Sequence, residues 1–402
     1  MEQLSLEAIF TPEIIADPYP LYDQLRANSP VLPLPDANMI IVSSYQLVQA
    51  VLKDKSLGHT DDPRLTEEQL AELLSNPAVA TLRRTMLLMN PPDHTRLRSL
   101  VVRAFDARRI ESMRERIVQI ANDLIDQFIS RGEGDLVKLF THPLPVIVIC
   151  DMLGIPLEDR GQFVEESTVS GRLIDPTPMT PEELRAANES MLANQAYFAG
   201  LCAEREREPR DDLITGLVES HTEEGKLTQE EVTANIALLF GAGHETTVNL
   251  MGNGLLALYR NPEQLATLRA DPSLWSSTVE EFLRFDSSVQ LSGRGALADT
   301  EIAGVPAPKG TQVLTLLAAA NRDPDVFTDP QTFDIQRANS KPLSFGGGIH
   351  YCLGAQLARI EASLGLATLF ERLPNLQLDN IESPQWKQTI TLRGVESLPA
   401  HW

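Results

Sequence analysis

The sequence predicts a mainly α-helical protein with small β-sheets, built as one large domain over residues 1–402. Three observations support this fold class. Apolar residues recur at helical spacing from about residue 45 to residue 285. Strand-like segments are confined to the two sides of this region and to the C-terminus. No internal repeat or low-complexity linker divides the chain, so we expect the strand-rich ends to pack together.

The first elements are short. Asp17–Asn28 has the pattern of a helix, and residues 30–44 that of a two-stranded hairpin. The hairpin turn is expected at Pro35–Asn38, because proline, aspartate and asparagine favour turns. Extended segments return at residues 295–317, where glycine and proline mark two further turns.

One long central helix is marked at both ends. Thr228 and Glu231 have the spacing of a capping box, and Asn261–Pro262 ends the apolar run that follows. A helix of roughly 32 residues is about 48 Å long at 1.5 Å per residue. This length is enough to cross the whole domain.

The middle of this helix carries GAGHETT, residues 241–247. Each glycine inside a helix lowers helix stability by about 1 kcal/mol relative to alanine. Close packing against another helix is a sufficient explanation for the two glycines when they are considered by themselves. Glu245 and Thr246 are harder to explain, because a carboxylate and a hydroxyl are costly to bury without a use. The segment is therefore a candidate functional site.

Several familiar motifs are excluded. His244 and Glu245 lack the second histidine of a zinc protease, because that position is Val248. The run Gly346–Gly348 has neither the lysine of a phosphate-binding loop nor the third glycine of a dinucleotide fingerprint. No nucleophile elbow G-x-S-x-G occurs. The sequence therefore lacks the motifs by which hydrolases, P-loop proteins and Rossmann-fold enzymes are usually recognised.

Composition restricts partners and compartment. The net charge of -22 disfavours nucleic acid and anionic lipid as partners. Cys150, Cys202 and Cys352 are too few and too far apart for a disulfide framework, which suits a reducing cytoplasm. The longest apolar runs, residues 144–150 and 313–320, are shorter than the ~20 residues of a membrane span. We expect a cytoplasmic protein without a membrane anchor.

Cys352 lies between a glycine-rich run and a strong helical pattern. A helix N-terminus stabilises a thiolate, and preceding glycines allow positive φ angles that turn N–H groups toward the sulfur. Such a thiolate could be the axial ligand of a haem iron. A buried, inert cysteine is the alternative, and Cys352 alone does not decide between them.

The residues around Cys352 carry a specific resemblance. The stretch FGGGIHYCLG, residues 345–354, matches every fixed position of the cysteine-ligand loop of cytochrome P450 enzymes. The whole chain resembles the soluble bacterial members, including macrolide and polyketide hydroxylases. The resemblance implies a P450 fold with haem b between the long central helix and the helix after the cysteine. It also implies that Cys352 binds the iron and that Phe345 and Gly354 belong to the haem-binding loop.

Residues 242–247 resemble the oxygen-activation segment of the same family. There, small residues and a local opening of the helix make room for dioxygen. Ala242 and Gly243 would line that space beside the haem. Glu245 and Thr246 would relay protons to the oxygen.

Glu281 and Arg284 match the family's E-x-x-R element. The resemblance implies that this pair, with Arg337, supports the cysteine loop. From spacing alone, the first two residues are a surface ion pair worth a few tenths of a kcal/mol.

Four cationic side chains match family ligands of the haem propionates. Taken singly, each of them is best explained as a solvated surface cation. If Cys352 binds a haem, however, four cations around the dianionic edge of the porphyrin are the better explanation. Asn90 departs from the aspartate of many relatives. The four residues are His94, Arg98, Arg294 and His350.

A basic segment indicates an electron-transfer partner. Residues 94–116 contain seven arginines against three acidic residues, a local excess of +4 in an acidic protein. Such a patch can steer an acidic partner, and a ferredoxin reduced by its reductase fits. Arg103, Arg108 and Arg109 are the predicted docking residues. The alternative is a solvated helix face balanced by acidic residues elsewhere.

The resemblance predicts a monomeric monooxygenase that uses dioxygen and ferredoxin electrons on an apolar small molecule. Polyketides, macrolides, terpenoids, steroids and fatty acids are the substrate classes of related enzymes. The pocket would comprise residues 57–88 and 164–197 together with Leu291, Ser292 and Ile390. Two alternatives stay open, a peroxide-driven haem enzyme and a non-catalytic haem-based sensor or carrier. The presence of both Glu245 and Thr246 favours dioxygen, and a sensor would usually need a second domain.

Overall fold

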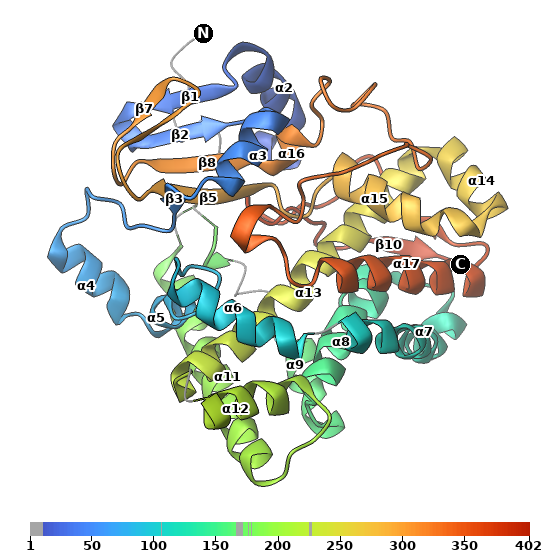
Figure 1. The fold of residues 1–402 in the computed structure, drawn as a ribbon. Coiled ribbons are helices and arrows are strands. Elements are labelled where there is room, and N and C mark those ends of the chain that lie inside the picture. The colour runs from blue at the N-terminus through green and yellow to red at the C-terminus, as the bar shows by residue number, and fades with distance from the viewer. Residues whose placement is uncertain (1–10, 106, 166–171, 176, 178, 225–226) are drawn as a thin grey trace.

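The computed structural model describes residues 11–105, 107–165, 172–175, 177, 179–224 and 227–402. The sheet of β1, β2, β8 and β5 forms one corner, and the longer helices occupy the rest of the view (Figure 1). The helices are α1 (Pro12–Ala16), α2 (Tyr19–Asn28), α3 (Tyr45–Lys53), α4 (Glu67–Ser75), α5 (Pro77–Arg83), α6 (Asp93–Ala104), α7 (Ala107–Phe128), α8 (Pro143–Leu153), α9 (Arg160–Glu165), α11 (Pro181–Arg207), α12 (Leu213–Glu224), α13 (Gln229–Arg260), α14 (Pro262–Ala270), α15 (Trp275–Phe285), α16 (Leu317–Ala320) and α17 (Ala355–Arg372). The strands are β1 (Val31–Leu34), β2 (Met39–Val42), β3 (Leu57–Gly58), β4 (Glu133–Asp135), β5 (Leu291–Ala296), β6 (Thr300–Ile302), β7 (Val305–Ala307), β8 (Gln312–Leu316), β9 (Gln377–Leu378) and β10 (Pro399–His401).

The main sheet joins distant parts of the chain in the order β1-β2-β8-β5-β3. The predicted hairpin forms, with Val31 opposite Val42 and with Asn38 at φ 48° in the turn. β2 pairs with β8 in parallel, so the N-terminal hairpin does pack against the later strands. The last strand departs from this expectation, because β10 pairs with β4 and β9, but Arg393, near the C-terminus, donates to the carbonyls of residues 15 and 16 at the N-terminal end.

The long central helix is α13, and its capping box forms as predicted. The Thr228 hydroxyl accepts from the Glu231 N–H at 3.1 Å, and the Glu231 carboxylate accepts from the Thr228 N–H at 2.8 Å. A Cβ on Gly243 would lie 3.1 Å from the Ile149 side chain of α8. Close packing therefore accounts for that glycine, as the packing interpretation predicted.

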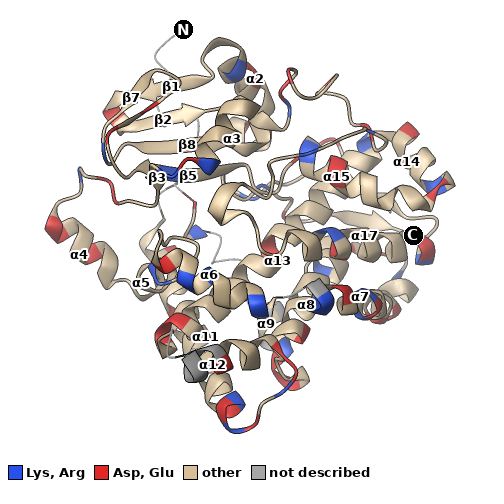
Figure 2. Ribbon diagram, viewed as in Figure 1, with Lys and Arg blue, Asp and Glu red and all other residues tan. Residues whose placement is uncertain are grey.

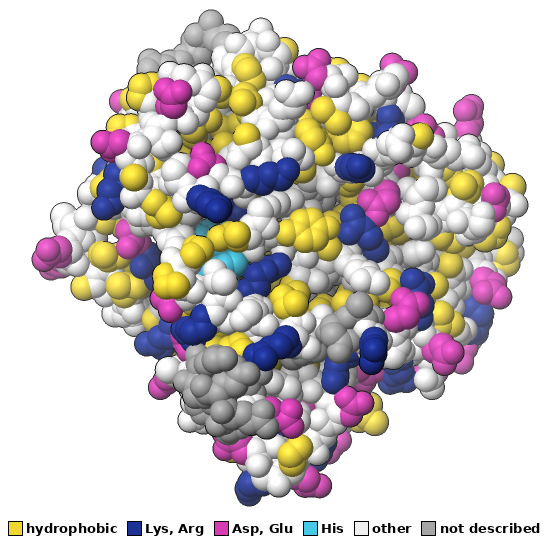
Figure 3. Space-filling model, viewed as in Figure 1, with side chains coloured by type: hydrophobic (Ala, Val, Ile, Leu, Met, Phe, Trp, Pro, Cys, Tyr) yellow, Lys and Arg dark blue, Asp and Glu magenta, His cyan; other side chains and the backbone are white. Residues whose placement is uncertain are grey.

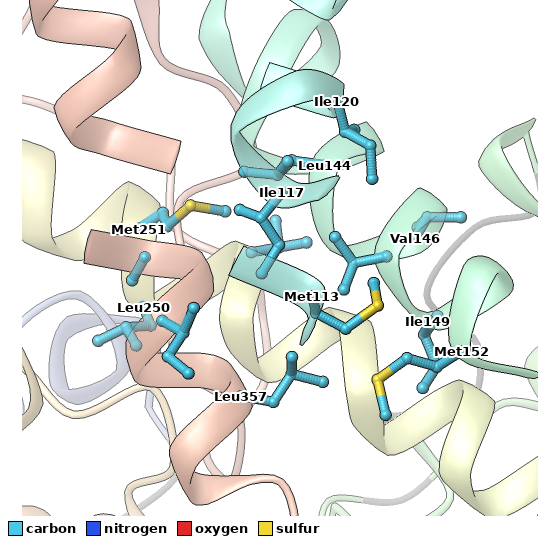
Figure 4. Packing of buried hydrophobic residues seen from close by; sticks show 14 of the residues in the cluster. Met113, Ile117, Ile120, Leu144, Val146, Ile149, Met152, Leu250, Met251 and Leu357 are labelled. Carbon is cyan, nitrogen blue, oxygen red and sulfur yellow. The ribbon is translucent and has the colours of Figure 1, made fainter. Parts of the chain in front are cut away.

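The core that holds the site is built by α7, α8, α13 and α17, which pack against one another. Figure 4 shows side chains of these four helices converging on one apolar cluster. Within the described residues, no helix is both long and apolar enough to cross a membrane. The labelled members of the cluster are Met113, Ile117, Ile120, Leu144, Val146, Ile149, Met152, Leu250, Met251 and Leu357.

Candidate functional site

The loop before α17 turns sharply at its glycines. Gly346 and Gly348 have φ angles of +70° and +64°, which favour glycine. A Cβ on Gly348 would also lie 2.1 Å from the carbonyl oxygen of Leu52. The loop closes where the Cys352 N–H donates to the Phe345 carbonyl at 3.0 Å. These glycines let the loop fold back against α3 and bring Cys352 to the start of α17.

Cys352 is the accessible cysteine of the three. The protein around its sulfur raises the pKa of the thiol by desolvation, and three groups oppose this rise. They are the Gly354 N–H, which hydrogen-bonds to the sulfur, and the positive charges of Arg98 and Arg359. The N–H group that affects the pKa of the thiol thus follows the cysteine, whereas we expected the preceding glycines to provide it. Because burial dominates, the neutral thiol is favoured, and a negative sulfur needs a further positive partner.

Histidine side chains gather beside this loop. The rings of His94 on α6 and His350 are 4.3 Å apart, and the ring of His59 is 4.9 Å from that of His350. Both ring nitrogens of His94, and Nε2 of the other two, are buried without a hydrogen-bond partner among the described residues. Such atoms are rare in folded proteins, and each needs an explanation.

Burial and like charges perturb this cluster. Burial lowers the pKa of His59 to about 4 and that of His350 to about 2, and Arg294 adds to both shifts. Burial lowers the pKa of Arg294 itself to about 10, and burial followed by the charge of Arg98 lowers that of His94. Positive groups are thus held together with too little negative charge. The residues fit a buried dianionic group, such as the propionate edge of a haem.

Sequence reasoning missed His59, although Asn90 gave a signal. The Asn90 carboxamide accepts from the His59 N–H at 2.8 Å and donates to the His59 carbonyl at 2.6 Å. The aspartate that the resemblance implies at this position could accept the first bond but could not donate the second when ionised. The departure at Asn90 is therefore matched to the placement of His59.

The GAGHETT segment of α13 has one exposed side and one buried side. Ala242 is exposed in the middle of α13, although His244 and Glu245 are buried. The Thr246 hydroxyl donates to the Ala242 carbonyl at 3.2 Å. Glu245 lies 3.5 Å from the ammonium group of Lys387. α13 is continuous from Gln229 to Arg260, so the local opening implied by the resemblance is not present.

The Glu281 and Arg284 pair is deeply buried, so the surface interpretation based on spacing is wrong. The Arg284 guanidinium binds both carboxylate oxygens of Glu281, at 2.7 and 2.6 Å, and both side chains are at most 1% exposed. Arg337 approaches the same carboxylate at 3.2 Å. Arg284 also donates to three backbone carbonyls beyond α16, which ties that segment to α15. These carbonyls belong to Asn321, Pro330 and Thr332.

The predicted pocket residues lie around β5. Leu291 and Ile390 are buried members of one apolar cluster, and the Ser292 hydroxyl accepts from Arg294 at 3.2 Å. The predicted stretch 164–197 includes residues 166–171, 176 and 178, which lie outside the described residues.

The predicted docking residues lie on and beside α6. Figure 2 shows basic residues along α6 and acidic residues on α4. On the face in Figure 3, Lys and Arg side chains surround exposed apolar groups near the centre. Arg109 forms an ion pair with Asp211 at 2.8 Å, which reduces the charge it offers to a partner. Asp106 of this segment lies outside the described residues.

Comparison with known proteins agrees with this geometry. The family profile described as "Cytochrome P450" matches residues 31–392. The chain belongs to the cytochrome P450 family. It is 38% identical to "Putative cytochrome P450 133B2" of Xylella fastidiosa, over 99% of both chains. It is 40% identical to "Vitamin D(3) 25-hydroxylase" of Pseudonocardia autotrophica, over 97% of this chain and 95% of that protein.

A solved structure shows the same fold. P450BioI, in complex with a hexadec-9Z-enoic acid ligated acyl carrier protein, superposes with a TM-score of 0.89 at 37% identity. The match covers 98% of this chain and 100% of the other. The protein is accordingly a haem b oxidoreductase of the P450 monooxygenase class, with the mainly α P450 fold that the sequence predicted.

Proposed function

We propose that this P450 inserts one oxygen atom of dioxygen into an apolar small molecule, with electrons from a ferredoxin and its reductase. The observation that carries the proposal is the cluster of buried histidine nitrogens beside the cysteine loop, which have no partner among the described residues. A haem carboxylate edge would supply the missing negative charge. When bound, haem provides the iron at which dioxygen is activated.

Cys352 is the proposed iron ligand. Its sulfur already receives the Gly354 N–H and the positive charges of Arg98 and Arg359, which favour the thiolate. His94, Arg98, Arg294 and His350 would hold the propionates, and His59 would add a third imidazole. Phe345 lies under the guanidinium of Arg359, 4.5 Å from it, and would cover one side of the sulfur.

Glu245 and Thr246 are proposed to carry protons to the oxygen site. The Thr246 hydroxyl now donates to Ala242, and by rotating it could donate into the open space beside Ala242. Glu245 is buried one residue earlier and would resupply the proton. Ala242 would leave room there because its side chain is only a methyl group, whereas Gly243 packs against Ile149 of α8.

The substrate is proposed to be apolar and elongated or steroid-like. Leu291 and Ile390, which belong to one buried apolar cluster, would form an apolar wall of the predicted pocket. Two similar proteins support this range, the one named a vitamin D(3) hydroxylase and the one crystallised with a fatty-acyl carrier protein. Arg103 and Arg108 are the proposed ferredoxin contacts.

The proposal is tested by turnover with ferredoxin, reductase and NADPH, compared with hydrogen peroxide alone. We expect product with the first system, and Thr246→Ala should divert most electrons to peroxide. Thr233→Ala is the matched control, because the Thr233 hydroxyl makes the same helical bond to the Gln229 carbonyl. Activity with peroxide alone would identify a peroxygenase. Haem binding without turnover in either system would identify a sensor or carrier.

A further inference from the structure

We propose that Lys387 is a positioning residue that holds the carboxylate of Glu245 and thereby controls proton delivery through it. The inference rests on the proposed role of Glu245. The Lys387 ammonium is 3.5 Å from a carboxylate oxygen of Glu245. The two side chains are only 16% and 8% exposed, so the pair is shielded from water and salt.

Lys387 is held by a C-terminal hairpin, residues 386–395. Trp386 pairs with Val395, and the Lys387 N–H donates to the Gly394 carbonyl at 2.9 Å. The guanidinium of Arg393 lies 3.5 Å over the Trp386 ring and is anchored by Asp286 at 2.8 Å. The backbone at Lys387 is therefore fixed before its side chain reaches α13.

The hairpin lies along one polar face of α13. Glu245, Asn249 and Asn253 are four residues apart and share a face of the helix. A Cβ on Gly394 would lie 2.0 Å from the Asn249 carboxamide oxygen, and Asn253 donates to the Arg393 carbonyl at 3.0 Å. Contact along this face places Lys387 opposite Glu245.

The other end of the hairpin is tied to the predicted substrate region. The N–H groups of Ile390 and Thr391 both donate to one carboxylate oxygen of Asp175, each at 2.8 Å. Ile390 is also a predicted pocket residue. One short segment thus contacts the substrate side and the proton-relay acid.

Electrostatics explain why a cation beside this acid matters. A buried carboxylate is costly unless it is paired and hydrogen-bonded. The adjacent His244 does not provide the charge, because burial, with smaller contributions from His142 and Lys387, lowers its pKa to about 4. The Nδ1–H of neutral His244 donates to the Phe240 carbonyl at 2.8 Å. Lys387 therefore sets the position from which Glu245 transfers a proton toward Thr246.

The test compares Lys387→Met, Lys387→Arg, Glu245→Gln and the double variant Lys387→Met/Glu245→Gln in the haem-loaded enzyme. The control is Lys309→Met, an exposed lysine in the turn before β8. We expect Lys387→Met to lower the product formed per NADPH about as much as Glu245→Gln. The double variant should be no worse than either single variant, and Lys387→Arg should restore most of the yield.

A second measurement does not depend on turnover. In urea unfolding, each single variant changes the unfolding equilibrium constant by some factor. The factor measured for the double variant should differ from the product of the two single factors by about five-fold or more. Independent effects would overturn the inference, because no pair would exist. Coupled unfolding with a product yield equal to that of Lys309→Met would also overturn it, since the pair would then be only structural. Failure of the monooxygenase proposal itself would instead appear as absent turnover in the unmodified enzyme.

Discussion

Two buried clusters of charge flank the cysteine loop, and they differ in one respect. In the first, Glu281 pairs with both Arg284 and Arg337, and the remaining guanidinium donors reach backbone carbonyls. In the second, Arg98 and Arg294 accompany histidines whose ring nitrogens have no partner among the described residues. Satisfied buried charge holds a fold together, whereas unsatisfied buried charge marks the place of a ligand.

Breaking the satisfied cluster should have the largest effect. Glu281→Gln removes the negative charge between two buried guanidinium groups, and we expect a loss of about 3 kcal/mol or more in the free energy of unfolding. Denaturant unfolding measures the loss. Glu189→Gln, in an exposed pair with Arg185 on α11, is the control and should leave the unfolding midpoint unchanged. Equal midpoints for both variants would contradict the structural role.

Removing a charge from the unsatisfied cluster should weaken haem binding without lowering the stability of the haem-free protein. Arg294→Leu should speed haem transfer to a haem-scavenging globin by about 10-fold or more, because a charge-assisted bond to the haem is lost. The haem-free protein should be as stable as the original or more stable, because burial of that cation is costly. Arg114→Leu, in an exposed pair with Glu111 on α7, should change neither quantity. Slow haem transfer in the Arg294 variant would contradict the assignment.

The histidines predict a dependence on pH. The folded-state pKa of His59, about 4, lies below its ordinary value of 6.5, so the unfolded chain binds the proton more tightly. Stability of the haem-free protein is therefore full above about pH 6.5 and falls as the pH drops toward 4, by about 3 kcal/mol at most. His59→Phe should flatten this part of the curve in unfolding experiments. An unchanged slope would remove His59 from the cluster.

The smallest effect is expected on the surface near α6. Arg108→Glu should slow reduction by ferredoxin several-fold at low salt and little at high salt, because exposed charges are screened over about 10 Å at 0.1 M. Stopped-flow reduction at several salt concentrations measures this, with Arg185→Glu on α11 as the control. A salt-independent rate change would contradict docking at this segment.

These two clusters also show what the sequence could predict. α13 was predictable because its capping box and its terminating Asn261–Pro262 are local signals. The burial of Glu281 and Arg284 was not, because the carbonyls that satisfy Arg284 lie 37–48 residues further along the chain. His59 was missed for the same reason, since it meets His350 only after β3 joins β5.

The most direct test of the account is the spectrum of the reduced carbon monoxide complex of Cys352→Ala. Cys352 would hold the iron of the haem, and His94, Arg98 and Arg294 would hold its carboxylate edge. We predict that the variant loses the thiolate-type absorbance band shown by the unmodified protein. Cys202→Ala, a buried cysteine on α11, should keep that band. An unchanged band in Cys352→Ala would show that another group binds the iron and would contradict the account.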